Sequence, residues 1–111
     1  MNITEKTIDG VAVLAIGGRL DANSAGGLER RFLQLVEGGA SRFVFDLASL
    51  DYVSSAGLRS LLLAAKKTKS IQGRLALAHL NEHVKEVFDM SGFSAIFTLC
   101  ATEDEALQAV R

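Results

Sequence analysis

The apolar residues of this chain change their spacing along its length, and the changes predict an alternation of strands and helices. Residues 2–8 and 11–18 are strand-like segments that flank Asp9 and Gly10. Asp-Gly between two such segments is typical of a two-residue hairpin turn, because both central residues of that turn adopt a positive φ. The sequence therefore predicts an antiparallel hairpin at the start of the chain.

Four later segments are predicted to be helices, and in three of them apolar residues recur at intervals of three to four, as on one face of a helix. The expected inward-facing residues are Leu28, Phe32, Leu35 and Val36 in the first, Leu58, Leu61, Leu62 and Ala65 in the second, and Val84, Val87 and Phe88 in the third. Asn23 or Ser24 is expected to cap the first helix and Asn81 the third, because their side-chain oxygens accept hydrogen bonds from unpaired backbone N–H groups. The last predicted helix opens with Thr102 and, three residues on, Glu105, which is the spacing of a capping box.

Three further strands are predicted between these helices, in residues 41–50, 74–80 and 95–100. The first contains a continuous apolar run around Val44, which is typical of a strand buried on both faces. The predicted order is β-β-α-β-α-β-α-β-α, and strands that alternate with helices form a sheet covered by helices. The predicted fold class is therefore α/β, with one domain over residues 1–111 that packs a mixed sheet of about five strands with about four helices.

Composition and charge exclude several classes of function. The chain has 49% hydrophobic and 23% charged residues and a net charge of −1. Nucleic-acid binders carry a basic stripe with interleaved aromatic residues, whereas aromatic residues make up only 6% of this chain. The first residues lack the pattern of a signal peptide, and no run reaches the roughly 18 apolar residues of a membrane span. We therefore expect a soluble cytoplasmic protein that binds neither nucleic acid nor membrane, with its single cysteine, Cys100, buried as a small apolar side chain.

The segment LDYVSSAGLRSLLLAAKK, residues 50–67, places two adjacent serines before an apolar run. From the residues alone, the more common interpretation is that Ser54 or Ser55 caps the helix that follows, which is worth about 1 kcal/mol. A second interpretation is that one of them accepts a phosphate, because the unpaired N–H groups and partial positive charge of a helix N-terminus tolerate that group well. The two interpretations are compatible.

This segment resembles the STAS family, and within it the bacterial anti-sigma factor antagonists. The matching pieces lie in the family's order along nearly the whole chain: Gly18-Arg19-Leu20-Asp21, residues 43–62, Gly73 before a predicted strand, and TEDEAL at residues 102–107. The central piece is the most specific of these, and the others are individually weak. The resemblance implies a mixed sheet with helices packed on it, in agreement with the predicted order of elements.

The resemblance also implies a partner switch. In that scheme the unphosphorylated antagonist binds an anti-sigma factor that is also a serine kinase, and this binding frees a sigma factor. The kinase then phosphorylates a serine at the helix start, which breaks the complex, and a separate serine phosphatase removes the phosphate. The chain would be a substrate and not an enzyme, and it would hold no cofactor, because the nucleotide belongs to the kinase.

The chain departs from the family pattern at the acceptor serine. Many members read acidic-Ser-Ser-Gly-Leu, and their second serine accepts the phosphate. With Gly57 aligned, this chain has Ala56 at the acceptor position and Ser54 at the acidic one. Ser55 is the nearest hydroxyl and is therefore the predicted phosphorylation site, with Ser54 as the alternate. A member that is not phosphorylated at all is the third alternative.

Residues around this segment are predicted to contact the partner. Asp21 and Asp46 end predicted strands, where they either form a contact rim for the kinase or stabilise turns. On a helical wheel Leu63 falls opposite the inward face, among basic residues such as Arg59, so it is either a partner contact or one of the exposed leucines that are normal on protein surfaces. The predicted partner-binding residues are Asp21, Asp46, Ser54, Ala56, Gly57, Arg59 and Leu63.

Alternative functions remain open. A STAS module can regulate another output, such as secretion, a stress-sensing assembly or lipid transport. A small-molecule-binding domain and an unrecognised serine hydrolase are alternatives of another class. The hydrolase is disfavoured because VSSAG is not a Gly-x-Ser-x-Gly elbow and because His79 and His83 lie on other predicted elements. These histidines are four residues apart but have no evident third ligand, so no metal site is predicted.

Overall fold

The computed structural model describes residues 1–111, and the hairpin predicted at the start of the chain is present. The elements are β1 (Asn2–Ile8), β2 (Val11–Leu20), α1 (Ala25–Glu37), β3 (Arg42–Asp46), β4 (Leu50–Val53), α2 (Ser55–Ser70), β5 (Arg74–Ala78), α3 (Glu82–Ser91), a 3₁₀ turn (Phe93–Ala95), β6 (Thr98–Cys100) and α4 (Glu103–Ala109). β1 and β2 are antiparallel, and Asp9 and Gly10 between them have φ angles of 51° and 79°. The remaining strands pair in parallel, in the order β1-β2-β3-β5-β6, with β4 beside the end of β2.

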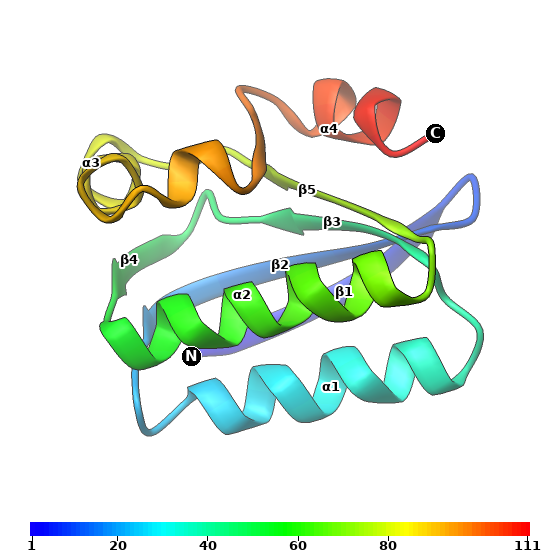
Figure 1. Ribbon diagram of the computed structural model, residues 1–111, viewed down its shortest axis with the longest axis horizontal. Helices are drawn as coiled ribbons and strands as arrows, with labels where there is room; N and C mark the ends of the chain where they lie inside the picture. The colour runs from blue at the N-terminus through cyan, green and yellow to red at the C-terminus, as the bar shows by residue number, and fades with distance from the viewer.

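Helices cover both faces of this sheet. α1 and α2 lie side by side along one face, and α4 lies on the opposite side (Figure 1). Alternate residues of β3 enter different cores: Phe43 and Phe45 pack with α1 and α2, whereas Val44 packs beneath α4. This alternation explains why β3 appears as a continuous apolar run in the sequence.

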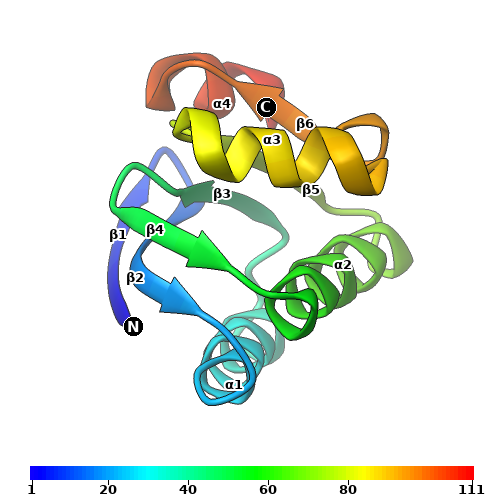
Figure 2. The same ribbon diagram turned by 90° about the vertical axis from the view of Figure 1, so that its left-hand side faces the viewer.

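Two strand predictions need correction. The sheet has a sixth strand, β4, because the strand predicted over residues 41–50 ends at Asp46 and a separate strand begins at Leu50. β4 runs parallel to the end of β2 and leads directly into α2 (Figure 2). The strand predicted over residues 95–100 is shorter, because a 3₁₀ turn occupies Phe93–Ala95 and only Thr98–Cys100 pairs with β5. Both errors arise from short elements whose apolar residues are too few to establish a period.

The buried face of α2 is rotated slightly about the helix axis from the face that the sequence predicts. Leu58 and Leu61 are buried as predicted, but Leu62 and Ala65 are only half-buried, and Ala64 is buried in their place. α2 packs against α1 as well as against the sheet, so its buried face points between the two.

Cys100 is likewise half-buried rather than buried. Partial burial, with a smaller effect of the Glu105 carboxylate, raises the pKa of its thiol and keeps the thiol protonated near neutral pH.

Candidate functional site

Helix α2 follows β4 along the chain, and its first residues contact the C-terminal end of β2. The Ser54 N–H donates to the Leu20 carbonyl oxygen at 2.9 Å. A Cβ atom at Gly57 would lie 2.4 Å from the same oxygen, closer than real Cβ atoms approach. Glycine therefore occupies the first turn of α2 because the helix is held against the backbone of β2. This contact fixes the position of both serines relative to the sheet.

The two serines have different environments. Ser54 is the N-cap residue, with an extended backbone (φ −91°, ψ 175°), and its hydroxyl oxygen accepts a hydrogen bond from the Gly57 N–H at 3.2 Å. Ser55 is the first residue of α2, its side chain is exposed, and its hydroxyl makes no hydrogen bond within the chain. The capping role predicted for one of the serines therefore belongs to Ser54. Ser55 presents the free hydroxyl at the surface.

Asp21 lies at the same end of the sheet as the serines. It follows Leu20, whose carbonyl receives the Ser54 N–H. One of its carboxylate oxygens accepts from the Asn23 N–H at 3.0 Å, and its own N–H donates to Ser24 Oγ at 2.9 Å. Ser24 is the N-cap residue of α1 but makes no capping bond with its side chain. Asp21 thus stabilises the turn between β2 and α1, and this turn is next to the start of α2.

Asp46 does not join this cluster. It ends β3, and its Oδ1 accepts from the Ala48 N–H at 3.0 Å and lies 3.1 Å from His79 Nδ1. Asp46 is paired with Ala15 of β2, whereas Val53, which precedes the serines, is paired with Leu20 at the end of the same strand. The structure therefore brings Asp21, but not Asp46, to the end of the sheet that carries the serines.

Arg59 and Leu63 continue the exposed face of α2 that starts at Ser55. The three residues are spaced by four, so they lie on one side of the helix. Arg59 is exposed, and Leu63 retains 36% of its accessible surface, which agrees with the predicted exposure of this leucine. Ala56, which follows Ser55, is half-buried, and Gly57 is buried, so neither offers more than a small surface to a partner.

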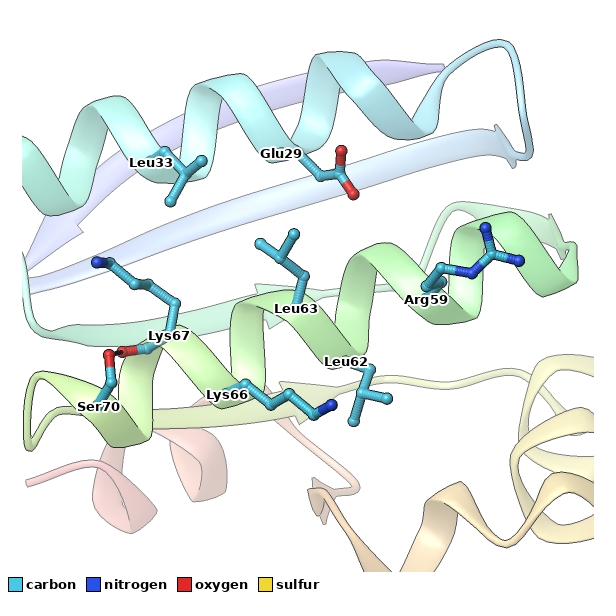
Figure 3. A pocket seen from close by; sticks show the side chains of 8 residues that line it. All are labelled: Glu29, Leu33, Arg59, Leu62, Leu63, Lys66, Lys67 and Ser70. Carbon is cyan, nitrogen blue, oxygen red and sulfur yellow. Dashed lines mark hydrogen bonds between the residues drawn. The ribbon is translucent and has the colours of Figure 1, made fainter.

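Leu63 lies in a groove between α1 and α2, which we call the α1–α2 groove (Figure 3). It has a volume of about 590 Å³ and is lined by Glu29, Leu33, Arg59, Leu62, Leu63, Lys66, Lys67 and Ser70. The wheel of α2 alone could not identify the contribution of Leu33 and Glu29, because these residues belong to a different helix. Only the parallel placement of the two helices brings them together.

Neither histidine of the chain hydrogen-bonds to a serine. His79 contacts Asp46, and His83 is exposed on α3, so neither is held against a serine. No group of three or more side chains of the metal-binding types comes together. No helix has both the length and the apolar character needed to cross a bilayer.

The fold and the start of α2 are those of a known class of domain. Residues 2–106 match the family model of the STAS domain, and the chain belongs to that family.

Individual relatives agree with this assignment. Over 111 residues, the chain is 40% identical to BtrV of Bordetella bronchiseptica, a protein named as an anti-sigma factor antagonist, and the match covers 100% of this chain and 96% of BtrV. It is 30% identical over 112 residues to the anti-sigma-F factor antagonist RsfB of Mycobacterium tuberculosis, covering 100% of this chain and 90% of RsfB. The crystal structure of a Thermotoga maritima protein, also named for anti-sigma factor antagonism, superposes with a TM-score of 0.93 at 23% identity, covering 98% of this chain and 94% of the other, which supports the fold.

Proposed function

We propose that this protein is a cytoplasmic anti-sigma factor antagonist that works by partner switching. It binds an anti-sigma factor serine kinase while Ser55 is unphosphorylated and leaves the complex once Ser55 carries a phosphate. A serine phosphatase restores the binding form. The names of its full-length relatives BtrV and RsfB support the general function.

Ser55 is chosen as the acceptor because only the Ser54 hydroxyl forms a hydrogen bond within the chain. Ser54 Oγ accepts the capping hydrogen bond from Gly57 and is half-buried, whereas Ser55 Oγ is exposed and unpaired. A kinase needs an accessible hydroxyl that can lie in line with the nucleotide, and Ser55 offers one without loss of the cap. Ala56 has no hydroxyl, so the acceptor position of the common family pattern is filled by a residue that cannot be modified.

A phosphate on Ser55 is compatible with the fold. The first N–H groups of a helix are unpaired and carry a partial positive charge, so an anion at the first position is favourable. The phosphate adds about −1.5 to −2 charges at neutral pH. The modification would therefore change the surface seen by the partner and leave the domain folded.

The proposal is tested with the kinase that copurifies with the tagged protein from its native cytoplasm and is identified by mass spectrometry. Incubation with the purified kinase and ATP should add one phosphate, on the peptide that contains Ser54 and Ser55. Ser55→Ala should abolish the labelling, and Ser54→Ala should keep it. Labelling that survives in Ser55→Ala and disappears in Ser54→Ala would contradict the assignment.

A further inference from the structure

The α1–α2 groove combines an apolar floor with a basic rim. Leu33 from α1 and Leu63 from α2 point toward one another across the groove, and Lys67 extends alongside Leu33 (Figure 3). Leu62 and Lys66 lie on the outer side of α2, next to one another. Of the four large apolar side chains that are exposed in this protein, Leu63 is the only one in this groove; the others are Met1, Met90 and Ile96.

The cations of the rim have no partners within the chain. None of Arg59, Lys66 and Lys67 takes part in any of the ion pairs of the structure. The one carboxylate of the groove is Glu29, and its Oε1 accepts a hydrogen bond from the buried Ser60 hydroxyl at 3.1 Å. The groove therefore has three unpaired positive charges against one negative charge, although the whole chain has a net charge of −1.

We propose that the α1–α2 groove docks an acidic amphipathic helix of the kinase. This inference rests on the proposed function and extends it, because it assigns a second contact beyond the phosphorylated serine. Apolar side chains of such a helix would cover Leu33 and Leu63, and its carboxylates would pair with the rim cations. Positions 59 to 70 of α2 span about 16 Å at 1.5 Å per residue, which matches three turns of an incoming helix.

The α1–α2 groove extends along α2 toward Ser55, at the start of the helix. Arg59 lines the groove and is one helical turn from Ser55, so a helix docked along α2 would end close to the acceptor hydroxyl. Docking would thereby hold Ser55 near the active site of the kinase before phosphate transfer. An open groove flanked by long, exposed lysines suits a protein segment better than a small ligand, which needs an enclosed site with fixed polar groups.

The test measures the affinity of the purified, ADP-bound kinase for two groove variants, Leu63→Asp and the double variant Lys66→Glu/Lys67→Glu. Both should weaken binding at least about tenfold, and the double variant should also reduce the dependence of affinity on salt. The matched controls are Met90→Asp, at an apolar side chain that is 81% exposed on α3, and Lys69→Glu, on α2 but outside the groove lining. Both controls should bind as the wild type does. Thermal unfolding shows whether each variant is folded, and the lysine variant decides the question if Leu63→Asp is not.

The outcomes separate this inference from the proposed function. If the wild type binds and is phosphorylated by the kinase, but the groove variants bind equally well, the groove proposal is wrong and the function stands. If no such kinase binds the wild type, the proposed function itself fails. Self-association in sedimentation experiments that Leu63→Asp abolishes would assign the groove to a second copy of the chain. Flotation with phosphatidylglycerol vesicles that the lysine variant abolishes would assign it to a membrane surface. Either result would overturn the kinase as the occupant.

Discussion

The Ser54 hydroxyl caps helix α2, whereas the Ser55 hydroxyl forms no hydrogen bond within the chain. Mutation can therefore separate the roles of these adjacent serines. Ser54→Ala removes the acceptor of the Gly57 N–H, which is the only side-chain cap of α2. Loss of such a cap costs about 1 kcal/mol. We expect Ser54→Ala to lower the free energy of unfolding in urea by about that amount, and Ser55→Ala to change it by less than about 0.5 kcal/mol.

The reverse order of these effects would mean that the cap is made by Ser55 in solution. Ser54→Asp provides a matched control, because aspartate is also a good N-cap residue and should restore most of the lost stability. The same variants serve the phosphorylation assay, so a loss of labelling can be distinguished from a loss of folding.

The sequence predicts the residues of this candidate site, but the choice between the serines needs physical detail that the sequence lacks. The adjacent serines, the glycine and the exposed Leu63 were all identified from spacing and resemblance. Which serine caps depends on the backbone angles at position 54, and adjacent hydroxyls at a helix start give no sign of them. The prediction for Asp46 has a different cause: the sequence does not reveal β4, which continues the sheet beyond Asp46 to the end of β2.

At the level of elements, two glycines near helix starts have opposite roles. Gly57 packs against the Leu20 carbonyl, so Gly57→Ala should displace the start of α2 and cost about 3 kcal/mol, the upper end of the usual cost of overpacking. The nearest atom to a Cβ at Gly26, in the first turn of α1, is an Arg30 side-chain nitrogen at an unstrained 3.5 Å. Gly26→Ala should therefore stabilise the protein by up to about 1 kcal/mol. Urea unfolding at 25 °C measures both, and equal effects would contradict this account.

The helices were predicted more accurately than the strands, because long periodic segments carry more information than short ones. Asn81 caps α3 as predicted, with its side-chain oxygen 2.8 Å from the Val84 N–H. Its amide also donates to the Leu50 carbonyl of β4, an interaction across 31 residues that spacing cannot reveal. β4 itself has only four residues, and the exposed Asp51 interrupts its apolar pattern. Tertiary pairing with the end of β2, more than local propensity, makes this segment a strand.

At the level of the whole molecule, the sheet fixes the position of Ser55, the proposed site of phosphorylation. The Ser55 position is tied through Ser54 and Gly57 to β2, a central strand that pairs with β1 on one side and with β3 and β4 on the other. Ser55 is exposed, so a negative charge added there would lie in solvent. The consequence of phosphorylation is therefore expected in the complex and not in the free protein.

The final prediction tests where the phosphate acts. In the proposed complex Ser55 would face the active site of the kinase, and after transfer its phosphate would lie beside the phosphates of the nucleotide. Like charges in a partly desolvated contact cost several kcal/mol, and each 1.4 kcal/mol is a factor of about ten in affinity. Ser55→Asp carries one of these charges and should weaken binding of the ADP-bound kinase at least about tenfold in titration calorimetry. Ser55→Ala, which removes the hydroxyl without adding charge, should bind as the wild type does.

The stability of the same variant distinguishes direct repulsion from a conformational switch. An acidic residue in the first turn of a helix is stabilising by about 0.3–1 kcal/mol, so free Ser55→Asp should be at least as stable as the wild type and keep its circular dichroism spectrum. If Ser55→Asp binds the kinase with unchanged affinity, electrostatic exclusion at this serine is ruled out. If it loses its fold, the switch acts through the structure of α2. Weakened binding by a folded, stable Ser55→Asp is the result expected when the charge itself separates the two proteins.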